Sequence, residues 1–104
     1  MEKILDKEPV KRVHEFITKF DPGLKVLVLD TTARTAKDAA TLLKCEVGAI
    51  VKSLLFRADE TFLICLIAGD KRCSLNKLKK IVEKKDVCMA NADEVKSITG
   101  FSIG

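Results

Sequence analysis

The fold of this 104-residue chain is decided by the stretch at residues 49–68, which reads AIVKSLLFRADETFLICLIA. It holds two nearly continuous apolar runs, residues 49–57 and 61–68, whose length and composition favour strands. Only the tripeptide ADE at 58–60 connects them, and so short a linker favours antiparallel neighbours. We therefore predict a β-hairpin over these residues.

Periodicity in the flanking sequence indicates a further helix and two short strands. Between residues 7 and 20 the apolar residues recur at spacings of three and four, as on one face of a helix, and a DPG turn closes the segment. Short apolar runs at 25–30 and 87–90 favour strands. The apolar positions of the predicted first helix are Val10, Val13, Ile17 and Phe20.

Capping residues predict three more helices. Thr35, Ser74 and Asn91 can each accept a hydrogen bond from the first turn of a helix, and Glu94 makes a capping box with Asn91. Gly100 is placed to end the last of these helices. The helix after Ser74 is expected to turn four apolar residues inward: Leu75, Leu78, Ile81 and Val82. Because strands and helices alternate, the predicted fold class is α/β, of the mixed α+β kind, with a central mixed sheet and flanking helices.

Composition limits the class of protein. The chain is 47% apolar and 33% charged, with a net charge of +4 and a mean hydropathy of +0.10. This balance predicts one folded domain over residues 1–104 and excludes a disordered chain. The longest apolar run, 62–69, is far shorter than the ~20 residues of a membrane-spanning helix, and charged residues between 2 and 8 interrupt any signal-peptide pattern. We expect a cytoplasmic protein with no membrane partner.

Cysteine and histidine are too sparse to indicate a metal site. Cys45, Cys65, Cys73 and Cys88 form no CxxC pair, and the single histidine, His14, is far from them in sequence. Without a secretion signal, reduced thiols that act as small hydrophobic residues are favoured over a disulfide framework. No phosphate-binding loop or similar motif occurs, so we expect neither a metal nor a cofactor.

Lys52 interrupts the apolar face of the first strand of the hairpin. Alternate residues of a strand share a face, so Ser53 points away from Lys52. The other members of the lysine's face are apolar: Ile50, Leu54 and Phe56. Two interpretations are open, an edge-strand lysine that discourages association between sheets and a functional lysine marked by the cost of burying its charge. The residues alone favour the first.

Positive charge is concentrated in one segment. Residues 71–85 hold seven basic residues and one acidic residue, a net charge of +6, whereas the rest of the chain carries −2. Such a cluster is typical of contact with a phosphate backbone, although a solvated helix face explains it equally well. The absence of Tyr and Trp argues against the stacking of single-stranded bases. The predicted RNA-binding residues are Arg72, Lys77, Lys80 and Lys84.

Five short motifs occur in order along the chain. They are TAKDAATLL at 35–43, IVKSLLF at 50–56, LIAGD at 66–70, VCMA at 87–90 and TGFSIG at 99–104. Each is weak alone, but together they cover most of the chain, and their order resembles the YbaK and prolyl-tRNA-synthetase-associated domain family. Members of that family are trans-acting or appended editing domains that hydrolyse the ester bond of mischarged aminoacyl-tRNA.

The resemblance implies roles for particular residues. Lys52 matches the family's active-site lysine, and Ser53 matches a position where small hydroxyl residues are common. Gly104 matches the first glycine of the family's GxxxP loop, and because the rest of that loop is absent, the resemblance implies that the C-terminal part of the domain is missing. A pocket for the acyl side chain is expected from the apolar neighbours of the lysine: Ile50, Leu54 and Phe56.

The function that the resemblance predicts is that of an aminoacyl-tRNA deacylase, a hydrolase of translation quality control. Its expected partners are mischarged aminoacyl-tRNA and, as a further candidate, an aminoacyl-tRNA synthetase, but not DNA. Two alternatives stay open. One is a tRNA-binding module without catalysis, and the other is an interaction module whose basic helix contacts a synthetase or another acidic protein.

Overall fold

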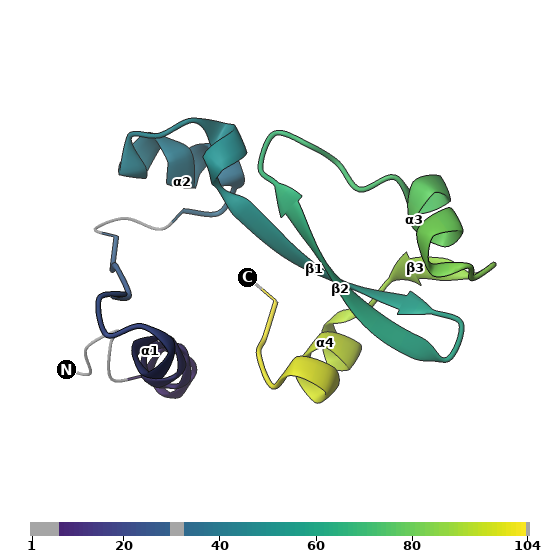
Figure 1. Ribbon diagram of the computed structural model, residues 1–104, viewed down its shortest axis with the longest axis horizontal. Coiled ribbons are helices and arrows are strands. Elements are labelled where there is room, and N and C mark those ends of the chain that lie inside the picture. The colour runs from purple at the N-terminus through teal and green to yellow at the C-terminus, as the bar shows by residue number, and fades with distance from the viewer. Residues whose placement is uncertain (1–6, 30–32, 104) are drawn as a thin grey trace. The chain divides into compact units, whose positions relative to one another are not determined.

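The structure is a computed structural model that describes residues 7–29 and 33–103 (Figure 1). The chain divides into two compact units, residues 1–32 and 33–104. The prediction that residues 1–104 form one domain stays a prediction. No helix in the described ranges is both long enough and apolar enough to cross a bilayer.

The described part of the first unit contains the helix α1 (Glu8–Phe20), as the periodicity predicts. The helix ends at Asp21, whose N–H donates to the carbonyl of Ile17 at 2.8 Å. The Asp21 carboxylate in turn accepts a hydrogen bond from the N–H of Gly23 at 2.9 Å, and this turn directs the chain away from the helix axis. No residue of α1 is fully buried, although Val10 and Ile17 of the apolar stripe are partly buried.

The strand predicted at residues 25–30 is not found. Residues 25–29 form no regular element and pair with no strand in the described parts of the chain, and Leu27 is 71% exposed. Asp30 lies outside the described residues. A strand is stabilised by backbone hydrogen bonds to a neighbour, so an apolar run without such a neighbour does not become one. The prediction is therefore wrong for the residues described.

The second unit is built on the predicted hairpin. β1 (Val51–Ala58) and β2 (Thr61–Ala68) pair antiparallel along their whole length, so every residue of β1 has a partner in β2. The two-residue turn between them places Asp59 in the left-handed region, with φ 52°, which aspartate tolerates better than most residues. The hydroxyl of Thr61 donates to the carbonyl of Ala58 at 2.9 Å and closes the turn. The predicted hairpin is confirmed.

A third strand, β3 (Val87–Met89), pairs antiparallel with the end of β1, which gives the order β2-β1-β3 (Figure 1). Every strand pair in the described residues is antiparallel, whereas the sequence predicts a mixed sheet. The reason lies at the hairpin turn, where the N–H of Asp59 donates to the carbonyl of Asp86 at 2.8 Å and the N–H of Asp86 donates to the Asp59 carboxylate at 3.2 Å. The chain thus enters β3 beside the end of β1 and runs back along it. The α/β fold class itself is confirmed.

Three helices of the second unit begin at their predicted caps: α2 (Ala36–Leu43), α3 (Leu75–Val82) and α4 (Ala92–Thr99). The hydroxyls of Thr35 and Ser74 each accept from the backbone N–H three residues on, at 3.0 and 3.3 Å. Asn91 and Glu94 form the complete capping box. Gly100 ends α4 with φ 79°, a left-handed conformation that glycine adopts without strain.

The core of the second unit lies between the sheet and α3. Its buried residues come from β1, α3 and β3, and Phe56 is only 2% exposed. Leu78 is buried against the sheet, and Val82, one turn later, is partly buried against the same cluster. The prediction that Ile81 and Leu75 face inward is wrong: Ile81 is 77% exposed and Leu75 is 40% exposed. A short helix on a small sheet buries one narrow stripe, and residues beside that stripe stay in solvent.

Gly69, at the end of β2, sits where a side chain does not fit. Its N–H donates to the carbonyl of Ile50 at 2.6 Å. A Cβ on this residue would collide with the carbonyl oxygen of Val47, in the 3₁₀ turn η2 (Val47–Ala49), and would lie 2.9 Å from the Cβ of Ala36 in α2. The end of β2 is therefore packed against both the start of β1 and the first turn of α2.

We predict that Gly69→Ala lowers the free energy of unfolding by about 1–3 kcal/mol, because the added methyl group meets backbone that cannot move without disturbing the hairpin. The matched control is Gly48→Ala, whose Cβ would meet the carboxylate of Asp70 at 3.1 Å. That exposed side chain can rotate away, so the cost is under about 0.5 kcal/mol. Urea unfolding followed by far-ultraviolet circular dichroism compares the two variants, and equal midpoints would contradict the close approach at Gly69.

Candidate functional site

Lys52, the second residue of β1, is held by a backbone carbonyl of the segment that follows β2. Its ammonium donates to the carbonyl oxygen of Lys71 at 2.9 Å. The residue is half-buried, and its partner in β2 is Ile67. β3 pairs with residues 56–58 only, so at Lys52 the described sheet has a neighbouring strand on one side alone. Lys52 thus lies at an unpaired edge of the described sheet, and its hydrogen bond to Lys71 fixes the position of its ammonium.

A tight turn brings the Lys71 carbonyl to Lys52. The N–H of Lys71 donates to the carbonyl of Ala68 at 3.0 Å, and the N–H of Gly69 donates to the carbonyl of Ile50 at 2.6 Å. These two bonds fold the chain back across the start of β1. A Cβ at Gly69 does not fit in this turn. Gly69 is therefore needed to place the Lys71 carbonyl, which is the acceptor for Lys52.

The Lys52 ammonium has hydrogen-bonding capacity left for a ligand. An ammonium carries three N–H donors, of which Lys71 takes one. Within residues 7–29 and 33–103 no carboxylate forms an ion pair with Lys52. A cation with unused donors and no carboxylate partner attracts an anionic oxygen or a polarised carbonyl.

Two of the predicted pocket residues lie beside the lysine and a third lies beneath it. Both are half-buried; Leu54 shares the lysine's face of β1, and Ile50 directly precedes the strand, two positions from Lys52. Phe56 shares that face too, but it is nearly completely buried in the core. It therefore supports the site from below and does not line its surface. The substrate-binding roles of these three residues stay predictions.

Ser53 is not brought to the lysine's face of the strand. Ser53 is exposed on the opposite face of β1, and Gly104 lies outside the described residues. A hollow of about 580 Å³ is also found on the opposite face, lined mainly by apolar side chains that include Leu55, Ile64 and Ile98. The sheet separates this hollow from Lys52, so the two do not form one site. The predicted roles of Ser53 and Gly104 stay predictions.

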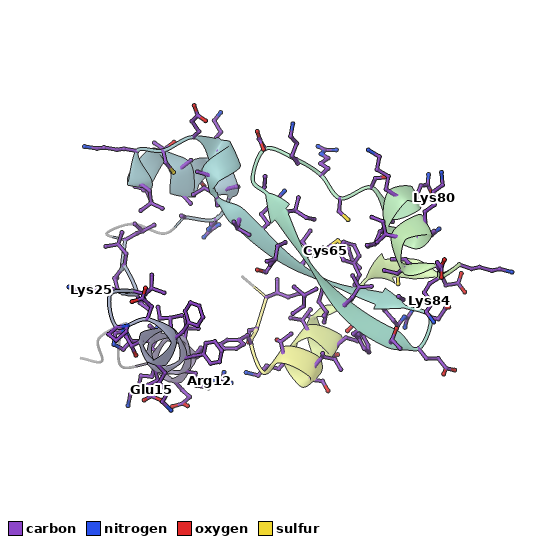
Figure 2. All side chains as sticks on the ribbon, viewed as in Figure 1. Arg12, Glu15, Lys25, Cys65, Lys80 and Lys84 are labelled. Carbon is purple, nitrogen blue, oxygen red and sulfur yellow. The ribbon has the colours of Figure 1, made fainter. Side chains whose placement is uncertain are left out.

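The predicted RNA-binding residues are all exposed and lie on α3 and the segments beside it; Lys80 and Lys84 are labelled in Figure 2. Lys77 and Lys80 belong to the helix, and Lys84 follows it. Arg72 directly follows Lys71, whose carbonyl binds Lys52. The basic surface, defined as the exposed basic residues of 71–85, therefore begins next to the acceptor of the lysine.

Sequence patterns do not reveal the role of Lys71 or of Gly69. Every residue has a backbone carbonyl, so only the fold shows which one meets the ammonium of Lys52. The position of Gly69 directly after an apolar run signals a turn, but it does not say what that turn approaches. Both contributions were missed for this reason.

Comparison with known proteins bears on this site. Residues 30–104 match the family described as the aminoacyl-tRNA editing domain. A proline–tRNA ligase of Caldicellulosiruptor saccharolyticus is 27% identical over 103 residues, which cover 99% of this chain and 16% of the ligase. The proline–tRNA ligase of Thermosipho africanus is 32% identical over 101 residues, which cover 95% of this chain and 18% of the ligase. The chain thus spans less than a fifth of these relatives.

A solved structure shares the fold. It is described as the crystal structure of a candidate trans-editing enzyme for prolyl tRNA synthetase, and it superimposes with a TM-score of 0.85 at 36% sequence identity. The likeness covers 94% of this chain and 62% of that one. The resemblance indicated by the five ordered motifs is therefore confirmed. Since the family match extends over residues 30–104, well over half of the sequence, the chain belongs to the aminoacyl-tRNA editing domain family.

Proposed function

We propose that the chain is an aminoacyl-tRNA deacylase that hydrolyses the ester bond of mischarged tRNA. The observation that carries this proposal is the ammonium of Lys52, held 2.9 Å from the Lys71 carbonyl at an open strand edge, with two donors that meet no acceptor in the part of the chain that the structure describes. Family membership supports it. The likeness to proline–tRNA ligases and to a candidate trans-editing enzyme for prolyl tRNA synthetase favours tRNAPro as the RNA.

The chemistry needs a cation where negative charge develops. Water attacks the ester carbonyl, and charge builds on the carbonyl oxygen. The bond from the carbonyl carbon to the terminal ribose oxygen then breaks, and that oxygen takes up a proton, which yields free amino acid and uncharged tRNA. A preorganised ammonium stabilises the charge without reorganising at that moment. The unused N–H groups of Lys52 orient the ester by binding its oxygen or the adjacent phosphate.

Apolar surface beside the lysine supports discrimination among acyl groups. Leu54 is half-buried on the same face of β1 as Lys52, and Ile50 is half-buried directly before the strand. An apolar pocket separates side chains by size, at roughly 1–3 kcal/mol per methylene group. We infer that these two residues contact the side chain of the amino acid to be removed.

The basic surface fits the polyanionic part of the substrate. Residues 71–85 carry a net charge of +6, and the surface starts one residue from the carbonyl that binds Lys52. An ester placed at Lys52 therefore has the phosphates of the same tRNA within reach of Arg72 and α3. Phosphate contacts of this kind position the RNA without reading its sequence.

Two other functions use the same surfaces. A tRNA-binding module without catalysis, or a module that contacts a synthetase, needs the basic surface but no positioned ammonium. The defined position of Lys52 favours the deacylase over both. Ester hydrolysis that depends on Lys52 is the property that distinguishes it from them.

We predict that Lys52→Ala slows the hydrolysis of mischarged tRNAPro by on the order of 10²-fold or more, because the charge that stabilises the developing oxyanion is removed. Lys52→Gln keeps a side chain that donates hydrogen bonds, one atom shorter, but not the charge, so it is expected to be nearly as slow. The measurement is single-turnover release of radiolabelled amino acid, with tRNAPro charged with each member of a panel of non-cognate amino acids.

The matched control for this prediction is Lys96→Ala. The ammonium of Lys96 also donates to a backbone carbonyl, that of Gly100 at 3.3 Å, but it lies on α4 and has no role in the proposal. This variant should hydrolyse the ester at the parent rate. Normal hydrolysis by Lys52→Ala would remove the proposed role of the lysine. Binding of tRNA without any hydrolysis by the parent chain would favour the non-catalytic module.

The double variant Lys77→Glu/Lys80→Glu is expected to bind tRNA more weakly. The logarithm of affinity should also fall less steeply with the logarithm of salt concentration, by roughly 0.7–0.9 for each phosphate that the variant no longer neutralises. Filter binding over a salt series measures both effects. The control Lys25→Glu/Lys37→Glu makes the same change in net charge outside residues 71–85 and should keep the parent slope. If the two double variants behave alike, binding depends on net charge and not on the basic surface.

A further inference from the structure

The carboxylate of Asp70 lies at the turn that brings the acceptor to Lys52. The N–H of Lys71 donates to the carbonyl of Ala68 at 3.0 Å, so Gly69 and Asp70 are the two central residues of this turn. Gly69 has no side chain. The Asp70 carboxylate is therefore the side-chain group at the centre of the turn, one residue before the carbonyl that accepts from Lys52 at 2.9 Å.

This carboxylate lies against η2. A Cβ at Gly48 would lie 3.1 Å from one carboxylate oxygen of Asp70 and 3.3 Å from the other, so both oxygens are beside the glycine. Gly48 belongs to η2, which leads through Ile50 into β1. Figure 1 shows the start of β1 beside the end of β2, where Val51 pairs with Ala68. Asp70 and Lys52 thus belong to the same end of the hairpin.

The Asp70 carboxylate has no partner in the part of the chain that the structure describes. It accepts no hydrogen bond there, and the ion pair found among these residues joins Arg57 to Glu94. Asp21 and Asp59 also lie at turns, and each accepts a hydrogen bond from a backbone N–H, at 2.9 and 3.2 Å. An aspartate commonly stabilises a turn in this way, but Asp70 does not. Its charge is therefore available to a ligand.

A negative charge at this position does not suit the phosphates of the proposed substrate. The basic surface begins at Lys71, directly after Asp70, and a phosphate drawn to that surface is repelled by the carboxylate. Every aminoacyl ester, however, carries a positive group next to its carbonyl, the α-ammonium, which is largely protonated at neutral pH. The carboxylate of Asp70 is complementary to that ammonium.

We propose, on the basis of the proposed function, that Asp70 binds the α-ammonium of the aminoacyl group and thereby restricts the site to esters of amino acids whose amino group is free. Lys52 binds the ester oxygen or the adjacent phosphate, and Asp70 binds the amino side of the same ester. Charge-assisted hydrogen bonds of opposite sign then fix the orientation of the carbonyl between them. Asp70 is in this sense a substrate-binding residue that determines specificity.

The test compares two esters of tRNAPro that differ in the charge of this one group. The first carries a non-cognate amino acid, and the second carries the corresponding α-hydroxy acid, in which a neutral hydroxyl replaces the ammonium. Single-turnover hydrolysis of each ester is measured at pH 7 and divided by the rate of the same ester in buffer, because the two esters differ in intrinsic reactivity. The ratio of the two quotients is the preference of the chain for the charged ester.

The parent chain is expected to prefer the charged ester by on the order of tenfold, the size of one charge-assisted hydrogen bond. Asp70→Asn should lose this preference by slowing the aminoacyl ester alone. Its melting temperature should equal the parent's, because the carboxylate accepts no hydrogen bond in the described residues.

Two further variants sharpen the test. Gly48→Ala places a Cβ where the Asp70 carboxylate lies, so it should also reduce the preference, and its combination with Asp70→Asn should cause no further loss. The matched control is Glu60→Gln, which removes the same charge from an exposed residue at the other end of the hairpin and should keep the parent's preference.

Equal hydrolysis of the two esters by the parent, or an unchanged preference in Asp70→Asn, would overturn the proposal. Equal slowing of both esters in Asp70→Asn would overturn it too, because Asp70 would then act on the turn and not on the ammonium. A parent chain that hydrolyses neither ester removes the proposed function instead. Both esters then survive, and filter binding compares their affinities. Tighter binding of the aminoacyl ester by the parent, lost in Asp70→Asn, supports the contact with the ammonium, and equal affinities overturn it.

Discussion

The antiparallel register of β1 and β2 is the constraint on which the second unit depends. At the open end of the hairpin the N–H of Gly69 donates to the carbonyl of Ile50 at 2.6 Å. The backbone approaches so closely there that a residue with a Cβ does not fit. A shift of the register by one residue would exchange the two faces of a strand. Phe56 would then leave the core, and Lys52 would leave its acceptor. One set of backbone hydrogen bonds therefore determines both the core and the site.

The two ends of the hairpin differ in how their charges are paired. At the turn, hydrogen bonds between Asp59 and Asp86 hold the start of β3. Arg57 lies 3.6 Å from Glu94 there, with side chains 50% and 23% exposed, and a pair so open to water contributes under about 1 kcal/mol. It orients α4 more than it stabilises the fold. At the other end, no described carboxylate pairs with Lys52, so its charge is left for a ligand.

Residues 71–74 connect the proposed site, the basic surface and the core. Lys71 supplies the acceptor for the ammonium, and Arg72 opens the basic surface. Cys73 packs against the core, and Ser74 begins α3. A displacement of this short segment would therefore change the proposed site, the basic surface and the core.

The sequence by itself determined the features whose causes are local. The hairpin at 49–68, the helix caps and the ordered family motifs each depend on residues a few positions apart, so periodicity and capping rules were sufficient. Only the tertiary structure decided that the run at 25–30 has no strand partner among the described residues, that Ile81 stays in solvent, and that the Lys71 carbonyl holds Lys52. Each of these depends on a contact between segments, or on the lack of one. A local sequence pattern indicates which secondary structure a residue favours, but not which distant residue it contacts. Such contacts are therefore decided only by the tertiary structure.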